Sequence, residues 1–270
     1  MDESLEQLVQ SVLESPKYLH LHIGLVRRIA RNELVKRGKY KAALKATRSK
    51  LHQVGGAYFP SKIRKEEYPV WLGHLRESAN DQEKIMHHCR EIMARHASTK
   101  ERLPILDHYY SRIMDDLPPI RSVIDVGCGL NPLAIPWMGL AQGASYYACD
   151  IYLDIMDFIQ EALDFFPVQG SAEARDVIAD PPTEPADLAL VLKTLPCLEQ
   201  LERRAGEVLL DRLNTRYMLV SFPARSLGGR KKGMQKNYGE FFESLVRDKA
   251  WAIKRFDFTN EIAYFITKGA

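Results

Sequence analysis

The residues best suited to chemistry lie in the stretch 121–132, where two closely spaced glycines interrupt a short apolar run. Residues 122–126 are rich in β-branched side chains and predict a strand, and Pro132 suits the first turn of a following helix. Gly127 and Gly129 leave no Cβ between the backbone and a ligand that lies across the strand end. The stretch therefore predicts a strand, a tight turn and a helix that together bind a nucleoside.

Carboxylates at three points along the chain indicate which nucleoside this is. Asp125 lies two residues before the first glycine, where a carboxylate suits a cationic ligand better than a pyrophosphate. Asp150 ends a second predicted strand and is placed to bind ribose hydroxyls, and Asp176 with Val177 suits an adenine edge. This order and spacing resemble the S-adenosylmethionine (SAM) site of class I methyltransferases. The alternative is a structural turn with two ordinary helix-capping acids.

The elements that position these residues alternate between strand and helix from residue 118 onward. Strands are predicted at 122–126, 145–150, 168–175, 186–192, 217–222, 252–258 and 262–267. The pattern predicts an α/β fold: a Rossmann-like doubly wound sheet closed by a C-terminal antiparallel hairpin, as in class I SAM-dependent methyltransferases. We expect residues 118–270 to form this domain. Residues 61–117 are predicted to be a helical connection that contributes to the cofactor pocket, and residues 1–60 a basic helical domain.

Charge is distributed unevenly along the chain. The net charge is +3, but residues 17–50 contain eleven Lys or Arg and one acid, so this segment carries +10 and the remainder −7. Such asymmetry predicts a face that binds a polyanion. The residues expected to contact RNA phosphates here are Arg27, Arg28, Lys36, Lys39 and Arg48. The alternative is a helical face that is merely solvated.

A second basic segment follows the fifth predicted strand. Between Arg225 and Lys236 there are five basic residues and no acid, with glycine turns among them. We expect this segment to bind RNA phosphates through Arg225, Arg230, Lys231 and Lys232. Phe222, just before it, is either a stacking partner for an extruded base or a core residue at a strand end.

The composition indicates where in the cell the protein is expected to act. No run of 18 apolar residues exists, and the acidic start Met-Asp-Glu-Ser-Leu-Glu differs from a signal peptide. We therefore expect a cytoplasmic protein without membrane contacts, and nothing indicates more than a monomer. The four cysteines form no CxxC pair and have no histidines at zinc spacing, so no metal site is predicted.

The residues after the fourth predicted strand bear on the reaction. Enzymes that methylate exocyclic amines usually have Asp or Asn, two prolines and an aromatic residue here, whereas residues 193–196 read Lys-Thr-Leu-Pro. Cys197 follows, and a cysteine beside a proline is the nucleophile of cytosine-C5 methyltransferases, which leaves that reaction as an alternative. A ring nitrogen such as guanine N7 carries a lone pair and no proton, so its methylation needs placement rather than a general base.

Several longer motifs resemble one family. Residues 96–102 read His-Ala-Ser-Thr-Lys-Glu-Arg, residues 128–132 read Cys-Gly-Leu-Asn-Pro, residues 193–196 follow Lys-x-Leu-Pro, and residues 221–230 read Ser-Phe-Pro-Ala-Arg-Ser-Leu-Gly-Gly-Arg. Together they are similar to the Arm/Rmt family of aminoglycoside-resistance 16S rRNA methyltransferases. These enzymes modify guanine N7 in the decoding A site of the 30S subunit. The resemblance extends nearly end to end.

The resemblance implies a site and a substrate. It implies that SAM, converted to S-adenosyl-L-homocysteine (SAH), binds among Tyr58, His96, Ala97, Ser98, Arg102, Gly127, Gly129, Asp150, Asp176, Val177 and Leu192. In this arrangement Arg102 pairs with the methionine carboxylate. Lys193, Phe222 and Arg225 are expected to position the target, and no catalytic base is expected. The implied partner is 16S rRNA within the 30S subunit. A 30S-binding factor with a vestigial SAM pocket is the alternative that is not an enzyme.

Overall fold

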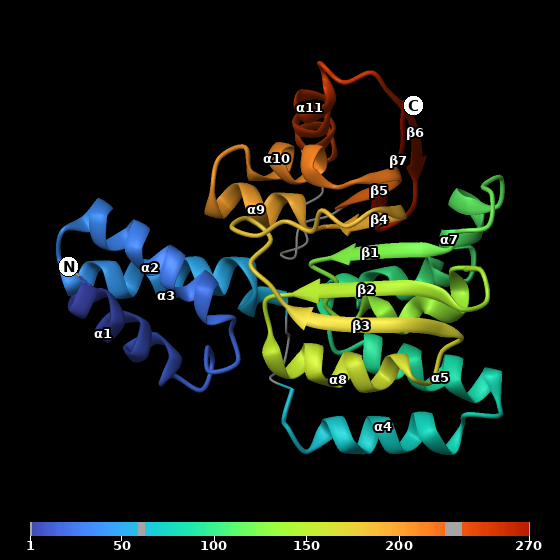
Figure 1. Ribbon diagram of the computed structural model, residues 1–270, viewed down its shortest axis with the longest axis horizontal. Helices are drawn as coiled ribbons and strands as arrows, with labels where there is room; N and C mark the ends of the chain where they lie inside the picture. The colour runs from blue at the N-terminus through green and yellow to red at the C-terminus, as the bar shows by residue number, and fades with distance from the viewer. Residues whose placement is uncertain (1, 59–62, 225–233, 270) are drawn as a thin grey trace.

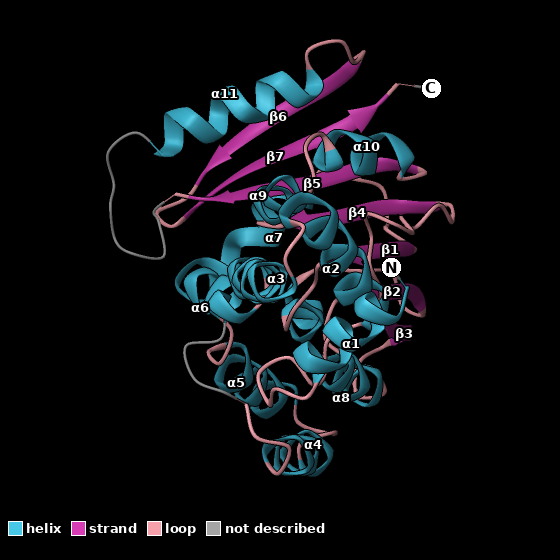
Figure 2. Cartoon of the chain, turned by 90° about the vertical axis from the view of Figure 1, so that its left-hand side faces the viewer, coloured by secondary structure: helices cyan, strands magenta, loops and turns pink. Residues whose placement is uncertain are grey.

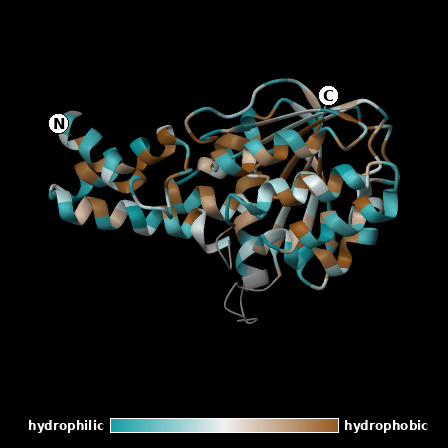
Figure 3. Cartoon of the chain, turned by 90° about the horizontal axis from the view of Figure 1, so that it is seen from below, coloured by the Kyte–Doolittle hydropathy of each residue, from teal (hydrophilic) through white to brown (hydrophobic). Residues whose placement is uncertain are grey.

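The structure is a computed structural model that describes residues 2–58, 63–224 and 234–269. A bundle of N-terminal helices forms one end of the molecule, and an α/β body with one sheet forms the other (Figure 1). The helices carry hydrophobic bands beside hydrophilic ones (Figure 3), the pattern of helices that bury one face. Among the described helices, none has both the length and the apolar character needed to span a membrane.

The N-terminal helices build a core of their own. They are α1 (Asp2–Leu13), α2 (Ile23–Arg37) and α3 (Tyr40–Val54). Apolar residues at helical spacing, such as Leu8 and Val12 of α1 and Val26 of α2, are fully buried between these helices. Ile151 and Tyr152 of the α/β body also pack against this core. The bundle is therefore joined to the body beside the end of a strand.

A helical connection links the bundle to the sheet. Its elements are η1 (Gly56–Tyr58), α4 (Glu67–Glu77), α5 (Gln82–Met93), α6 (Ala97–Arg102), η2 (Leu103–Ile105) and α7 (Leu106–Met114). Side chains of α4, α5 and α7 belong to the same hydrophobic core as one face of the sheet. The connection therefore covers the sheet and is part of the α/β body.

In the described part of the chain, seven strands form a single sheet in the order β3-β2-β1-β4-β5-β7-β6. The strands are β1 (Ser122–Val126), β2 (Ala144–Asp150), β3 (Val168–Ala174), β4 (Ala186–Leu192), β5 (Thr215–Pro223), β6 (Trp251–Asp257) and β7 (Glu261–Lys268). Strands β1 to β5 are parallel, and β7 is antiparallel to both β5 and β6. This is the predicted doubly wound sheet with its C-terminal hairpin.

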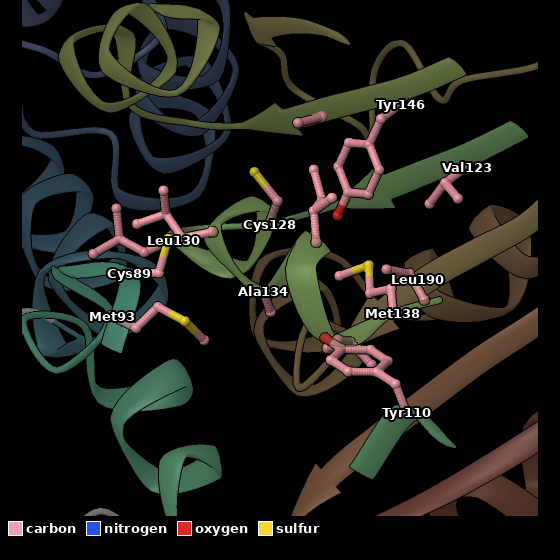
Figure 4. Packing of buried hydrophobic residues seen from close by; sticks show 14 of the residues in the cluster. Cys89, Met93, Tyr110, Val123, Cys128, Leu130, Ala134, Met138, Tyr146 and Leu190 are labelled. Atoms are coloured by element: carbon pink, nitrogen blue, oxygen red, sulfur yellow. The ribbon is translucent and has the colours of Figure 1, made fainter. Parts of the chain in front are cut away.

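Helices cover both faces of the sheet, so its central strands are apolar on both sides. Val123 of β1 packs on the face covered by α4, α5, α7 and α8 (Leu153–Leu163), together with Tyr110 and Tyr146 (Figure 4). Ile124 and Val126 pack on the opposite face with α9 (Leu195–Leu201), α10 (Ala205–Arg212) and α11 (Met234–Val246). Figure 2 shows α11 running beside the C-terminal hairpin.

The helix predicted after the glycine turn is a short 3-10 helix. Residues Asn131–Trp137 form a 3-10 helix, η3, with a proline at its start and Pro136 inside it. A proline has no backbone N–H, so Pro136 cannot donate the bond that would extend an α-helix. The strand order reverses between β1 and β4, and a crevice opens at the carboxyl ends of these two strands.

Candidate functional site

A pocket opens in this crevice. The strand ends contribute Gly127, Asp150 and Leu192 to its wall. The rest of the wall consists of Val54, Gly55, Tyr58, His96, Ser98, Ile151, Tyr152, Arg175, Val177, Lys193, Thr194, Cys197, Leu198 and Leu201. Open α/β sheets bind ligands at such a switch point. The end of the N-terminal bundle therefore forms one side of the candidate ligand site.

Most of the residues predicted to bind the cofactor lie on this wall: Tyr58, His96, Ser98, Gly127, Asp150, Val177 and Leu192. Four further predicted residues, all within the described ranges, lie outside it: Ala97, Arg102, Gly129 and Asp176. Sequence reasoning missed Tyr152, Arg175 and Thr194. Each lies within two residues of a predicted position and just after the end of a strand, β2, β3 or β4. Closeness to a strand end could therefore have identified all three.

The two glycines of the turn are needed for both conformation and space. Gly127 has φ 63° and Gly129 has φ 53°, backbone angles that residues with a Cβ rarely adopt. A Cβ on Gly127 would lie 2.6 Å from Cγ2 of Thr194, and one on Gly129 would lie 2.8 Å from Cε1 of His96. The turn therefore packs tightly under two side chains of the pocket wall.

Asp150 is fixed by the backbone at the end of β2. Its Oδ2 accepts a hydrogen bond from Gly129 N at 2.8 Å, and its Oδ1 accepts one from Ile151 N at 2.6 Å. Burial raises the pKa of this carboxyl although these backbone donors oppose the shift. A carboxylate oxygen can accept more than one hydrogen bond, so Asp150 retains acceptors for ligand hydroxyls.

Asp125 lies beneath the turn and is not on the pocket wall. Its Oδ2 accepts from Asn131 Nδ2 at 2.8 Å and from the Tyr146 hydroxyl at 2.7 Å. Burial raises its pKa to about 6. Asp125 therefore supports the turn by holding Asn131, the first residue of η3, and does not line the pocket.

Asp176 is paired with the N-terminal bundle. Arg28 Nε lies 2.7 Å from Oδ2 of Asp176, and Arg28 Nη2 lies 2.9 Å from Oδ1. Asp176 is 4% exposed, and its neighbour Val177 lines the pocket. Arg28 was predicted to bind RNA phosphates. In the structure its guanidinium instead pairs with Asp176, an acid of the α/β body.

Arg102, which the resemblance pairs with the methionine carboxylate, is paired with other side chains of the protein in this structure. Its side chain is 0% exposed; Nη2 lies 2.9 Å from Glu261 Oε1, and Nη1 lies 2.7 Å from Asn131 Oδ1. The guanidinium therefore faces Glu261 and not the pocket. Burial opposes ionisation of Glu261, but Arg102 and Lys193 outweigh it and lower its pKa to about 2. Glu261 was not identified from the sequence. The available sign was that an acid stands at the first position of an otherwise apolar strand, β7.

Lys193 lies on the pocket wall in an unusual backbone conformation. Its φ is 60°, in the left-handed region, where a residue with a Cβ is strained. Nζ donates to Glu101 Oε2 at 2.8 Å and to Ser98 O at 3.2 Å, and it lies 3.2 Å from Glu261 Oε2. These contacts join β4, α6 and β7 at one edge of the pocket.

Tyr58 and Cys197 meet across the pocket, with the Tyr58 hydroxyl 2.9 Å from Cys197 Sγ. The Tyr58 ring stacks on His96 with the ring centroids 5.8 Å apart. Burial raises the pKa of Cys197 to about 11, so its thiol is protonated at neutral pH. Burial, Lys193 and Arg102 lower the pKa of His96 to about 3, so this ring is neutral.

These protonation states limit the chemistry of the pocket. His96 is a weak base because its pKa is lowered to about 3, and Cys197 is a protonated thiol, so neither is an activated base or nucleophile. In the ranges that the structure describes, no group of three or more His, Cys, Asp or Glu could hold a metal ion. The arrangement suits a reaction that needs placement of two reactants and no proton transfer.

Phe222 belongs to the core, which corrects its proposed stacking role. Its side chain is 0% exposed and stacks on Tyr238 with centroids 5.3 Å apart. Phe242 and Tyr264 surround the same ring. A ring enclosed in this way cannot stack on an extruded base. The basic residues predicted beyond it, Arg225, Arg230, Lys231 and Lys232, lie outside the described residues.

The basic residues of the bundle differ in their contacts. Lys36 and Lys39 are exposed, and within the described chain neither has an acidic partner. Arg27 pairs with Glu6 at 2.8 Å, and Arg48 donates to Ser11 O at 2.7 Å. Lys36 and Lys39 are therefore the most accessible of the five predicted phosphate contacts, whereas Arg28 is engaged by the α/β body.

Comparison with known proteins agrees with this fold. A family model described as ribosomal RNA methyltransferase (FmrO) matches residues 14–266. A 16S rRNA (guanine(1405)-N(7))-methyltransferase of Micromonospora rosea is 39% identical over 270 residues, which span 99% of this chain and 98% of the relative. The crystal structure of the 16S rRNA methyltransferase RmtF in complex with SAH is similar at a TM-score of 0.85, with 31% identity over 100% of both chains. The 16S rRNA methylase RmtB is similar at a TM-score of 0.78, with 33% identity over 98% of each chain. The chain therefore belongs to the ribosomal RNA methyltransferase (FmrO) family.

Proposed function

We propose that the protein transfers the methyl group of SAM to N7 of a guanine in the decoding A site of 16S rRNA, which gives resistance to aminoglycosides. The observation that carries this proposal is the pocket at the strand ends, where Gly127 and Asp150 meet. The similarity to the RmtF complex with SAH supports the cofactor. The guanine-N7 methyltransferase activity of the Micromonospora rosea relative supports the target atom.

In this proposal one end of the pocket binds the nucleoside of SAM and the other end binds its methionine part. Asp150 accepts hydrogen bonds from the ribose hydroxyls, and Val177 with Leu198 provides apolar surface for the adenine. The methionine carboxylate needs a cation at the other end. Lys193 lines the pocket there, whereas Arg102 reaches a ligand only if its guanidinium turns away from Glu261.

The proposed reaction is a direct displacement. The N7 lone pair attacks the methyl carbon as the bond from carbon to sulfur breaks, so SAM becomes SAH and the guanine gains a positive charge. No proton leaves N7 in this step, which agrees with the lowered pKa of His96, a weak base, and with the protonated thiol of Cys197 on the pocket wall. The protein therefore contributes alignment of the two reactants and exclusion of water.

We further propose that the exposed basic face of α2 and α3 docks on rRNA within the assembled 30S subunit. Lys36 and Lys39 supply positive charge for the phosphates. The bundle that carries this face also forms one wall of the pocket through Val54 and Gly55. In this model the protein acts as a monomer in the cytoplasm, where its ribosomal substrate is found.

The test is methyl transfer from radiolabelled SAM to purified 30S subunits, naked 16S rRNA and 70S ribosomes. The modified base is then identified by mass spectrometry and reverse-transcription mapping. We expect label on one A-site guanine N7 in 30S subunits alone. Measurable SAM binding without transfer to any of these substrates would refute the enzyme and favour a 30S-binding factor. Label on a cytosine C5 would instead favour the reaction through Cys197.

A further inference from the structure

The N-terminal bundle contacts both strand-end loops that enclose the nucleoside end of the pocket. At the loop after β2, His22 N donates to Ile151 O at 2.8 Å, and Leu153 N donates to His20 O at 2.8 Å. These two bonds flank the loop that begins at Asp150. At the loop after β3, the side chain of Arg28 contacts Asp176.

Arg28 donates two parallel hydrogen bonds to the carboxylate of Asp176. The distances are 2.7 Å from Nε to Oδ2 and 2.9 Å from Nη2 to Oδ1, across 148 residues of sequence. Arg28 is 18% exposed and Asp176 is 4% exposed, so water screens this pair weakly. The remaining polar contact of Arg28 is a longer one, 3.4 Å from Nη1 to Oε2 of the exposed Glu202. A bidentate pair of this kind fixes orientation as well as charge.

Asp176 in turn shapes the loop that carries Val177 to the pocket. Its Oδ1 accepts from Ile178 N at 3.3 Å. Its main-chain carbonyl accepts from Ala179 N at 3.0 Å and from Asp180 N at 2.9 Å. The side-chain rotamer that Arg28 fixes is therefore the one that supports this turn, and the turn directs Val177 into the pocket wall.

The adjacent residue provides an internal comparison. Arg27 has the same charge on the same helix and also makes two hydrogen bonds to a carboxylate, at 2.8 and 2.9 Å. Its partner is Glu6 of α1, inside the bundle. Only Arg28 crosses to the α/β body, so the two arginines separate the effect of basic charge from the effect of the interdomain contact.

We infer that Arg28 is a positioning residue for the cofactor, which acts through Asp176 to hold the loop at the adenine end of the SAM pocket. This inference rests on the proposed binding of SAM in that pocket. The helix that carries the rRNA-docking face thus also completes the cofactor site. Arg28 does not touch the reacting atoms, so its loss weakens cofactor binding more than it slows methyl transfer.

The first experiment measures SAH affinity by isothermal titration calorimetry for the full-length protein and three variants. We expect Arg28→Ala to weaken SAH binding by about tenfold, the order of a lost charged hydrogen bond. Arg27→Ala should stay within about twofold of the wild type. Arg28→Lys should be intermediate, because an ammonium group keeps the charge but cannot hold two carboxylate oxygens in the guanidinium geometry. Equal SAH affinity of Arg28→Ala and Arg27→Ala would overturn the inference.

Steady-state kinetics separates positioning from a general loss of structure. For Arg28→Ala we expect the KM for SAM to rise by about the same tenfold while kcat at saturating SAM changes by less than about twofold. A fall in kcat with unchanged KM would contradict a role in cofactor binding. Thermal unfolding without ligand is measured for each variant, and Arg28→Lys, which keeps the charge at the interface, tests the geometry even if Arg28→Ala is unstable.

A double-mutant cycle with Asp176→Asn tests whether Arg28 acts through Asp176. If it does, Arg28→Ala changes SAH affinity by less than about twofold once Asp176 is already Asn. Fully additive effects would show that Arg28 acts by another route and would refute the inference. The proposed function fails separately: in that case the wild-type protein itself does not bind SAH.

Discussion

The guanidinium of Arg102 and the carboxylate of Glu261 form a fully buried ion pair, with Nη2 and Oε1 2.9 Å apart, although the two residues are 159 positions apart in sequence. Glu261 also accepts a hydrogen bond from the Tyr109 hydroxyl at 2.8 Å and pairs with Lys193 at 3.2 Å. One acid of the C-terminal hairpin thus neutralises two cations beside the pocket. The hairpin therefore helps to build the site as well as the edge of the sheet.

Glu261→Gln tests this arrangement. The substitution leaves Arg102 buried opposite a neutral group, and breaking a buried pair in this way costs about 3–5 kcal/mol. We expect a loss of this order in the free energy of unfolding, measured by urea denaturation. The control is Asp257→Asn, which breaks an exposed pair with Arg255 on the same hairpin and should cost less than about 1 kcal/mol. Equal losses in the two variants would contradict a special role for Glu261.

The raised pKa of Asp125 predicts how the free energy of unfolding depends on pH. Its pKa in the folded protein is raised from 3.8 to about 6, chiefly by burial, so the folded state holds this proton more tightly than the unfolded state does. Its contribution to stability is therefore present below pH 4 and is lost as the pH rises through 6. We expect Asp125→Asn to remove this decline, seen as a flatter profile of unfolding free energy between pH 4 and 7. Parallel profiles for the two proteins would refute the shifted pKa.

Asp150→Ala tests the proposed ribose contact. Removing the carboxylate eliminates acceptors for two hydroxyls, so we expect SAH affinity to fall by about tenfold or more, measured by calorimetry. Asp157→Ala is the matched control, because Asp157 is an exposed acid on the neighbouring helix α8. Unchanged affinity in Asp150→Ala would remove the ribose assignment.

Reversing the charge of Lys36 and Lys39 tests the docking face. We expect weaker binding to 30S subunits and a smaller dependence of affinity on salt, because fewer counterions are released from phosphates. SAH affinity should not change, since neither residue lines the pocket. The control reverses Arg247 and Lys254, two exposed basic residues outside the N-terminal bundle, the first in the turn after α11 and the second on β6 (Figure 1). The docking role fails if both double variants bind 30S subunits equally.

Cys197→Ala distinguishes the two methylation reactions. A cytosine-C5 enzyme would lose all turnover with its nucleophile, whereas transfer to guanine N7 needs no thiol. We expect kcat within about threefold of the wild type, the loss reflecting the hydrogen bond to Tyr58. Complete loss of methyl transfer, with SAH binding intact, would restore the cysteine mechanism.

The sequence by itself determined the features that depend on a few consecutive residues. The strand before Gly127 and the turn through Gly129 could be predicted because β-branched residues and glycines have local conformational preferences. Asp150 could be placed because an acid at the end of a parallel strand lies at the open edge of the sheet. The alternation of strands and helices likewise follows from local hydrophobic patterns, and it predicted the doubly wound sheet.

Only the tertiary structure decided which polar groups meet. Arg28 and Asp176 lie 148 residues apart, and no local pattern distinguishes Arg28 from Arg27, which pairs inside the bundle. Glu261 carries no motif, yet packing of the hairpin brings it to Arg102. Phe222 was compatible with two environments until α11 and β7 enclosed its ring. Pairing and burial depend on contacts between distant segments, whereas strands and turns depend on the preferences of neighbouring residues.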